Sequence, residues 1–261
     1  MSNVDTTFTR YAGRVALALL GLGLVACSAG GGAGQHTLES GESLMLLFQE
    51  TEPGLEPYAT RMLINDAYVR MDDGNAASDY VLFDRDDETV YSVSHANRSI
   101  LVIHSKPVLG ESPIPLEMDA RRSKHPNAPP VAGHQPVQYT LLVNGQSCSQ
   151  VMVVPGMLQE GIMALREFRR VLAGQHAENL PKTPEEMLDP CFVAYHVFAP
   201  VQHLQYGFPI QQWDSQGVGR SLVDYDEAFK TDSELFVLPE SYPRMGVGLG
   251  GGAAVEGDTD A

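Results

Sequence analysis

The chain has 261 residues, of which 43% are hydrophobic and 19% are charged, and its formal net charge at neutral pH is −16. That length suits one large or two small globular domains, and we expect one. The strongly negative charge argues against a nucleic-acid partner and against a basic membrane-binding face, because nucleic acids and anionic lipid headgroups would both repel the chain.

The N-terminal segment has the pattern of a secretory signal peptide. Its apolar run, Val15–Val25, is much shorter than the roughly 20 apolar residues that span a bilayer, which indicates an export signal rather than a membrane helix. The run ends in Leu24-Val25-Ala26-Cys27, which resembles the bacterial lipobox. This resemblance implies that residues 1–26 are removed and that Cys27 carries palmitate-like acyl chains. An ordinary secreted protein, cut near an Ala-x-Ala site, is the alternative.

Ser28 follows the predicted lipid-carrying Cys27, where inner-membrane lipoproteins of enteric bacteria have aspartate. The sequence therefore favours an outer-membrane lipoprotein that faces the periplasm and contacts the membrane through its lipid. Several acyl chains would hold it firmly, since each buried CH₂ contributes roughly 0.8 kcal/mol. Residues 27–43 and 246–261 are rich in glycine without a hydrophobic period, which predicts a flexible tether and a disordered tail around a folded domain of residues 44–245.

Two cysteines remain once Cys27 is acylated, namely Cys148 and Cys191. We predict that they form a disulfide, because the export signal delivers the chain to a compartment where disulfides persist. A pair of buried free thiols is the main alternative. A metal site is disfavoured, since neither a C-x-x-C motif nor a nearby histidine pair supplies the usual ligand spacing.

Short β-strands separated by turn residues fill the first half of the folded region. They recur about every ten residues, as strands of a sandwich or barrel do. Residues two apart share one side of a strand, so we expect one face of this sheet to be apolar and the other to be more solvated. Met62 and Ile64, Val69 and Met71, and Tyr91 and Val93 are the pairs expected on the apolar side. The predicted strands are 44–49, 58–64, 67–72, 79–84, 89–94 and 99–104.

Residues 105–136 form a proline-rich stretch that cannot occupy a central strand. We predict a long, mobile loop, with a functional loop as the alternative. The positive charge of this acidic chain concentrates there, at Arg121-Arg122-Ser123-Lys124-His125. Such a cluster is either simply solvated, which we favour, or contacts anionic headgroups or an acidic partner.

A hairpin and a helical insert follow. Asn144-Gly145 between two β-runs predicts a two-residue turn, because both turn residues need positive φ. Apolar residues spaced by three and four predict a helix over 157–173 that stops at Gly174, and Thr183-Pro184-Glu185-Glu186 predicts the capping box of a second, short helix. We expect the insert, residues 156–198, to lie against the sheet as a lid. The charged residues expected mostly on the outer face of the first helix are Glu160, Arg166, Glu167, Arg169 and Arg170.

No catalytic motif stands out, because the sequence has no G-x-S-x-G elbow and no Ser-x-x-Lys pattern in its folded region. His196 and His203 lie close in sequence, but surface or internally satisfied histidines are a better interpretation than metal ligands. The acidic cluster Asp84–Glu88 lacks a calcium-binding loop and fits a solvated hairpin tip. Trp213 is interpreted as a core residue, with a ligand platform as the alternative. We therefore predict no catalytic residue, no metal and no cofactor.

The closing segments resemble a known family. The resemblance is carried by Gly207-Phe208-Pro209-Ile210, by an Asp-x-x-Gly turn at 214–217, by Leu235–Pro239 and by Tyr242. Together they resemble the end of the lipoprotein carriers that include LolA and LolB, and the segments Arg61–Leu63 and Phe83–Arg85 resemble an uncharacterised lipoprotein group within that set. The family implies a strongly curved antiparallel sheet, open as a half-barrel, whose concave apolar face is partly covered by helices and holds acyl chains. No segment matches the receptor's membrane-insertion loop or the carrier's acyl-binding arginine.

The predicted fold is therefore α+β, a curved antiparallel half-barrel whose concave face is covered by the helical insert. The predicted function is non-enzymatic binding of an acyl chain, a lipoprotein or another apolar ligand. The alternative is a structural or assembly lipoprotein whose concavity is filled by its own side chains, and an enzyme comes third. An open cavity lined by Met, Leu, Phe and Tyr would favour binding.

Overall fold

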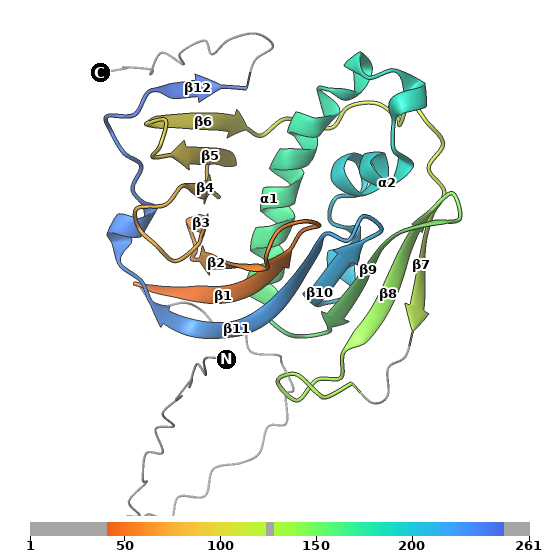
Figure 1. Ribbon diagram of the computed structural model, residues 1–261, viewed down its shortest axis with the longest axis horizontal. Helices are drawn as coiled ribbons and strands as arrows, with labels where there is room; N and C mark the ends of the chain where they lie inside the picture. The colour runs from red at the N-terminus through yellow and green to blue at the C-terminus, as the bar shows by residue number, and fades with distance from the viewer. Residues whose placement is uncertain (1–40, 124–127, 248–261) are drawn as a thin grey trace, which may run out of the picture. The chain divides into compact units, whose positions relative to one another are not determined.

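The computed structural model describes residues 41–123 and 128–247 (Figure 1). The predicted signal peptide, Cys27 and most of the predicted tether lie outside these ranges, as do Lys124 and His125 of the basic cluster and the tail from residue 248 onward. Within the described ranges, no helix has the length and apolar character needed to cross a membrane.

A single sheet of 12 strands organises the described part of the chain, in the order β12-β6-β5-β4-β3-β2-β1-β11-β10-β9-β8-β7. Consecutive antiparallel pairs link β1 through β6 on one side and β7 through β11 on the other, and the β1–β11 pair joins the two halves. β12 is added in parallel to β6. The strands are β1 (Glu42–Thr51), β2 (Tyr58–Ile64), β3 (Tyr68–Asp72), β4 (Tyr80–Asp84), β5 (Thr89–Ser94), β6 (Ser99–His104), β7 (Met118–Ser123), β8 (Val137–Val143), β9 (Gln146–Val154), β10 (Phe208–Asp214), β11 (Gly219–Lys230) and β12 (Arg244–Gly246).

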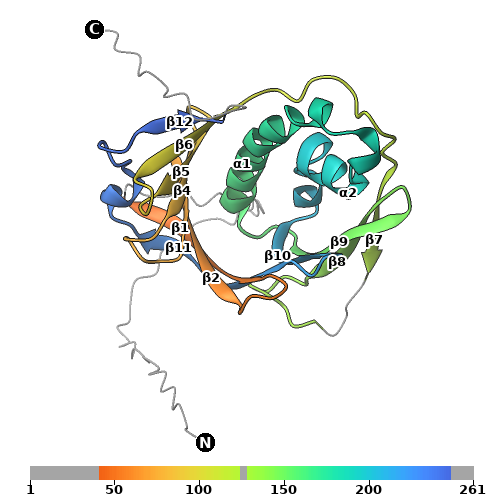
Figure 2. The same cartoon turned by 45° about the horizontal axis from the view of Figure 1, so that its top comes forward.

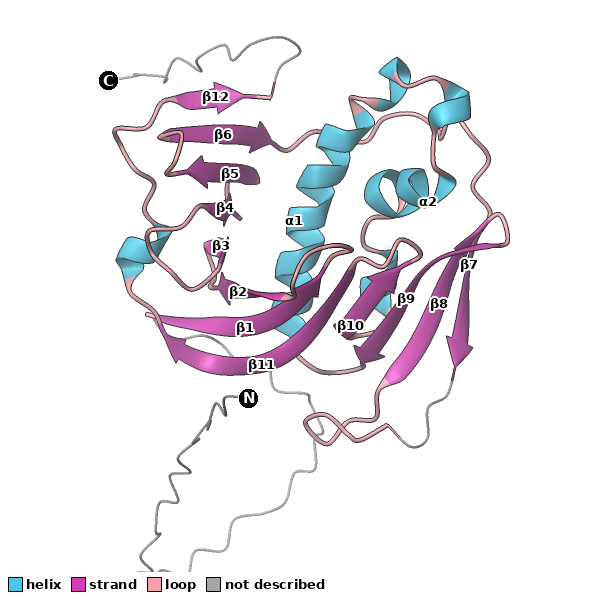
Figure 3. Cartoon of the chain, in the orientation of Figure 1, coloured by secondary structure: helices cyan, strands magenta, loops and turns pink. Residues whose placement is uncertain are grey.

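The sheet is curved, and the segment between β9 and β10 lies on the inside of the bend (Figures 2 and 3). The edge strands β7 and β12 do not pair with each other, so the sheet is open. The prediction of a curved, antiparallel sheet with a helical insert is thereby confirmed. The insert consists of α1 (Gln159–Ala177), η1 (Leu180–Lys182), η2 (Glu185–Met187), α2 (Pro190–Phe192), the π-helical η3 (Val193–Phe198) and η4 (Gln202–Gln205).

The strands predicted in the first half are confirmed, with ends that differ by at most two residues. β1 begins at Glu42, so the sheet starts slightly before the predicted boundary at Leu44. The predicted turn is also confirmed, since Asn144 and Gly145 have φ values of 53° and 79° between β8 and β9. The stretch 105–136 is not a loop throughout, because it contains the edge strand β7, which pairs with β8.

The predicted helix stop at Gly174 is wrong, because α1 continues to Ala177. The glycine instead allows a close approach between α1 and the chain that follows β6. A Cβ atom at this position would lie 2.1 Å from the backbone oxygen of Lys106, a separation that real Cβ atoms do not show. Packing against a distant segment, rather than helix termination, therefore explains why glycine stands at this position.

Replacing Gly174 by alanine is expected to lower the free energy of unfolding by about 2 kcal/mol, because the overpacking cost exceeds the roughly 1 kcal/mol by which alanine favours a helix. Urea denaturation measures the change. Arg170→Ala, at an exposed position of the same helix, serves as the control and should stay within about 0.5 kcal/mol of wild type. Equal stability of the two variants would show that Lys106 can move away without cost.

The predicted capping box is also wrong. Only the single 3₁₀ turn η2 forms there, and its cap residue Pro184 makes no side-chain hydrogen bond. The hydroxyl of Thr183 donates instead to the backbone carbonyl of Asn179 at 3.1 Å. A competing local hydrogen bond to the preceding turn thus replaces the cap.

Packing of α1 against the concave face forms the main hydrophobic core. Phe48 of β1, Phe83 of β4 and Phe208 of β10 are at most 2% exposed, and they belong to the same cluster as Ile162 and Leu165 of α1. Burying each large apolar side chain contributes about 1.5–3 kcal/mol, so this cluster holds the helix on the sheet. The period of two places alternate strand residues on this face, as expected.

The second face of the sheet is not solvated as predicted. Residues 233–242 pack on it through Phe236, Leu238 and Tyr242. Tyr91 and Val93 lie in this second cluster, whereas the other predicted pairs face α1. The two residues of each pair do share a face, as the strand period predicted. The face that was expected to be solvated is, however, covered by a segment distant in sequence.

A buried ion pair anchors this C-terminal segment. Arg70 Nε donates to Asp72 Oδ2 at 2.6 Å, and Arg61 makes two hydrogen bonds of 2.9 Å to the same carboxylate. Arg70 also donates to the carbonyl oxygen of Leu235 at 2.6 Å, and its guanidinium carbon lies 3.7 Å from the ring centroid of Tyr80. The cluster therefore ties β2 and β3 to the segment that covers their outer face.

Candidate functional site

A cavity of about 550 Å³ lies between α1, η3 and the concave face of the sheet. Cavities that hold small ligands measure about 300–1,000 Å³. The lining runs from buried side chains such as His203, which is 3% exposed, to exposed ones such as Phe192, which is 40% exposed. The cavity thus reaches from the interior to the surface, beneath the helical insert.

One stripe of α1 faces the cavity and contributes Leu165, Phe168, Arg169, Leu172 and His176. Successive members of this set are one, three or four residues apart in the sequence, so they share one side of the helix. The expectation that Arg169 lies on the outer face of the helix is wrong. It also fails for Glu160 and Glu167, because both pair with Arg85, the residue that follows β4. Arg169 is instead placed among apolar neighbours that line the cavity.

The sheet supplies the opposite wall. Met62 of β2 and Met71 of β3 are register partners and both line the cavity. Trp213 of β10 is partly exposed and also lines it, whereas none of the clusters found in the described residues includes this tryptophan. The preferred interpretation of Trp213 as a core residue is therefore wrong, and its ring forms part of the cavity wall.

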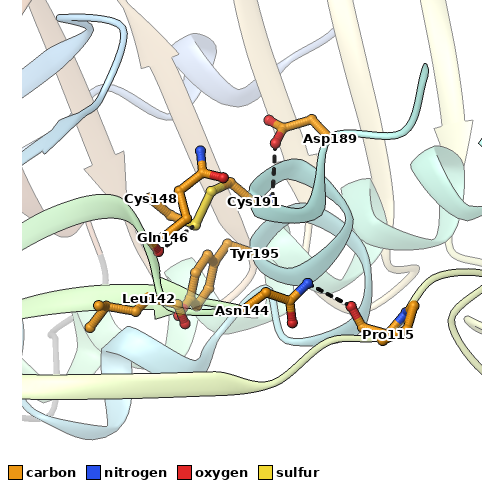
Figure 4. The surroundings of a disulfide bond; sticks show 8 residues. All are labelled: Pro115, Leu142, Asn144, Gln146, Cys148, Asp189, Cys191 and Tyr195. Carbon is orange, nitrogen blue, oxygen red and sulfur yellow. Dashed lines mark hydrogen bonds between the residues drawn. A yellow bond between two sulfur atoms is a disulfide. The ribbon is translucent and has the colours of Figure 1, made fainter. Parts of the chain in front are cut away.

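A disulfide fixes the helical wall to the sheet (Figure 4). Cys148 of β9 is bonded to Cys191 of α2, which confirms the predicted pair, and both residues line the cavity. The Asp189 carboxylate accepts a hydrogen bond from the Cys191 backbone nitrogen at 3.1 Å and so caps this turn. The Tyr195 hydroxyl of η3 donates to the carbonyl oxygen of Leu142 at 3.1 Å. Covalent and polar links together therefore hold η3 in place.

Two basic side chains of the cavity lining, Arg220 and Arg169, differ in their partners. Arg220 forms an ion pair with Glu50, in which Nη2 lies 2.6 Å from Oε1. Arg169 has neither a hydrogen bond nor an ion pair with any residue that the structure describes. Burial, and then the charge of Arg220, lower the pKa of Arg169 to about 10, so its guanidinium stays protonated at neutral pH. The cavity wall therefore carries an unmatched positive charge.

His203 of η4 lies beside this charge. Its Nε2 atom is buried without a hydrogen-bond partner in the described part of the chain. Burial, and then the charges of Arg169 and His196, hold the pKa of His203 well below its usual value. The interpretation of this histidine as a surface or satisfied residue is wrong, whereas His196 is exposed and stacks on Phe192 with ring centroids 4.9 Å apart.

The depressed pKa of His203 predicts a pH dependence of stability. Below its usual pKa of about 6.5, the unfolded chain takes up a proton that the folded protein excludes, so stability falls as the pH falls. One such group contributes a slope of at most about 1.4 kcal/mol per pH unit. We expect His203→Gln to lose less stability than wild type in urea denaturation between pH 7 and pH 5. If the free energy of unfolding had the same pH dependence in both proteins, the assignment of His203 as a buried, neutral histidine would be contradicted.

The other predicted site residues lie outside the cavity lining. Asp84 Oδ1 accepts hydrogen bonds from the backbone nitrogens of Asp86 and Asp87 at 3.1 Å each, so the acidic cluster forms a hairpin tip, as predicted. Arg121 lies on β7 with a 69% exposed side chain, paired with Asp119. Among residues 41–123 and 128–247, no group of three or more His, Cys, Asp or Glu residues could hold a metal ion.

No family model matches the chain, and no curated protein matches it. Two solved structures of PNGF-II, in the space groups C2 and P21, are similar to it with a TM-score of 0.37 and 10% sequence identity. Each match covers 78% of this chain and 31% of the PNGF-II chain, so this chain spans less than a third of the protein that it matches.

Proposed function

We propose that this protein is a membrane-anchored envelope lipoprotein that binds an acyl chain or another apolar ligand without catalysing a reaction. The observation that carries the proposal is the cavity of about 550 Å³ between α1 and the concave face of the sheet. A sheet curved around helices is also what the resemblance to the lipoprotein carriers implies. We therefore further propose that the fold is a half-barrel of that type.

The lining supports a flexible apolar ligand. Met62 and Met71 on the sheet lie opposite a helix stripe that includes Leu165, Phe168 and Leu172. Methionine side chains are unbranched and polarizable, so they adapt to chains of different shape. Many of the other lining residues are polar, so these apolar side chains form one part of the wall, against which a hydrophobic tail would pack.

The anchor in this proposal is Cys27, acylated and inserted in the outer membrane with the domain facing the periplasm. The disulfide between Cys148 and Cys191 supports export, because disulfides persist in the periplasm and are rare in the cytosol. Cys27→Ser should shift the protein from the membrane fraction to the soluble periplasmic fraction. Retention of the variant on the membrane would contradict the anchor.

A titration with a fluorescent long-chain acyl probe tests the binding function. We expect saturable binding to the Cys27→Ser protein and loss of binding when Leu172→Trp fills the cavity. Met163→Trp is the matched control, because Met163 is on the same helix, is 39% exposed and does not line the cavity. Absence of saturable binding, or equal binding by both tryptophan variants, would contradict the function.

An assembly role is the second candidate function. It is favoured by the dense packing of α1 against β1–β4, where the protein's own side chains already fill much of the concave face. In that case Leu172→Trp would leave acyl-probe fluorescence unchanged, because no probe would enter the cavity in either protein. The same titration therefore separates the two functions.

A further inference from the structure

Arg169 is a half-buried charge on a stripe of α1 whose neighbours Leu165, Phe168 and Leu172 are apolar. Buried charges in folded proteins are generally paired, because removing an ion from water without a partner is costly. Arg169 stands on the cavity-facing stripe of α1 between Leu165 and Leu172, and no described residue pairs with it. The positive charge is therefore available to a molecule inside the cavity.

The acidic residues of the lining do not supply the missing partner. Glu50 is engaged by Arg220. Asp214 Oδ1 accepts hydrogen bonds from the backbone nitrogens of Gln216 and Val218, at 2.8 and 3.0 Å, and Asp189 caps α2. Each carboxylate thus has its own structural role, and the guanidinium remains unmatched.

His203 provides an independent second observation at the same place. Its ring is 3% exposed, it lines the cavity, and its Nε2 atom has no partner among the described residues. The charge of Arg169 helps to lower the pKa of this ring, and both side chains line the same cavity. A polar group of a bound molecule would satisfy the nitrogen and the guanidinium together, since a single oxyanion accepts several hydrogen bonds.

We propose that Arg169 and His203 form a headgroup subsite, and that the cavity binds a single-chain amphiphile with an anionic carboxylate or phosphate headgroup. This inference rests on the proposed function, because the tail would occupy the apolar walls around Met62, Leu165 and Phe168. A local cation is needed for such a ligand, since the net charge of −16 repels anions at long range.

Binding of ligands that share one tail tests the subsite. The probes are dodecanoate, dodecyl phosphate and dodecanol, with inorganic phosphate alone as a fourth, measured by calorimetry on the Cys27→Ser protein. We expect at least one anionic amphiphile to bind about 10- to 100-fold more tightly than dodecanol. Arg169→Gln should abolish that preference, and Arg169→Lys should retain part of it. Arg170→Gln is the control, because Arg170 is exposed on the adjacent position of α1.

The outcomes separate the two proposals. Equal binding of all three amphiphiles, unchanged by Arg169→Gln, would overturn the headgroup subsite while leaving acyl binding intact. Binding of inorganic phosphate as tight as that of dodecyl phosphate would overturn the amphiphile in favour of a free anion. Binding of none of the four probes would overturn both proposals. The free energy of unfolding of ligand-free Arg169→Gln is a further readout. Removal of an unmatched charge should not lower this free energy, whereas removal of a residue that stabilises the fold would lower it.

Discussion

Asp72→Ala is expected to lower the free energy of unfolding by about 3–5 kcal/mol, because it leaves the guanidinium groups of Arg61 and Arg70 without their shared carboxylate. The Asp72 and Arg70 side chains are 0% and 3% exposed, so water cannot replace the lost partner. Arg70 also holds the carbonyl oxygen of Leu235, and the C-terminal segment over the outer face should therefore loosen. Chemical denaturation measures the loss, and amide exchange around Leu235 reports the loosening.

Asp119→Ala is the matched control for this prediction. Asp119 pairs with Arg121 at 3.4 Å, but both side chains are more than 60% exposed, so its removal should change stability by less than about 1 kcal/mol. Similar losses for the two variants would show that burial of the Asp72 cluster is not what makes it important.

The same cluster predicts a loss of stability in acid. Burial raises the pKa of Asp72, but the hydrogen bonds from Arg61 and Arg70 outweigh it and hold the pKa below its usual value. The stabilisation is therefore complete above the unfolded value of about 3.9 and is lost as the pH falls through the lower folded value. The Asp72→Ala protein should lack this component of acid unfolding.

Removal of the disulfide is also expected to lower the free energy of unfolding strongly. The double variant Cys148→Ala and Cys191→Ala should lose about 4 kcal/mol, because the bond closes a loop with a sequence separation of 43 residues. The change should also weaken acyl-probe binding, since the bond fixes the α2–η3 wall of the cavity to β9. Denaturation under oxidising conditions measures the stability.

Addition of reductant to the wild-type protein is the control for this variant. It should produce the same loss of stability and of probe binding, whereas reductant should leave the double variant unchanged. A loss of less than about 1 kcal/mol in both cases would indicate that the helical insert holds its place without the covalent link.

Local sequence signals predicted much of the sheet. Alternate side chains along β1–β6 point to opposite faces of the sheet, and the turn at Asn144-Gly145 needs positive φ at both residues, so each signal lies within a few residues. The pairing of Cys148 with Cys191 was inferred from a predicted export signal and from the two cysteines that remain once Cys27 is set aside. The strand and turn signals are thus local, whereas the disulfide could be predicted because only one pairing of the two cysteines exists.

The features missed from the sequence depend on contacts between distant segments. Gly174 is needed because the backbone of Lys106 packs against α1 at this position. Phe236 covers strands that lie far earlier in the chain. Arg169 was assigned to the outer face because charged residues usually occupy it, although its spacing of four from Leu165 and three from Leu172 placed it on the cavity stripe. That spacing was the available signal for the headgroup subsite.

Native mass spectrometry of the Cys27→Ser protein, purified without detergent, tests most directly whether the cavity under α1 holds a ligand. We expect the Cys27→Ser protein to show a second population that is heavier by the mass of one acyl-chain amphiphile. This population should be absent when Leu172→Trp is added to fill the cavity. A single ligand-free species, together with no uptake of added dodecanoate, dodecyl phosphate or dodecanol, would contradict the account.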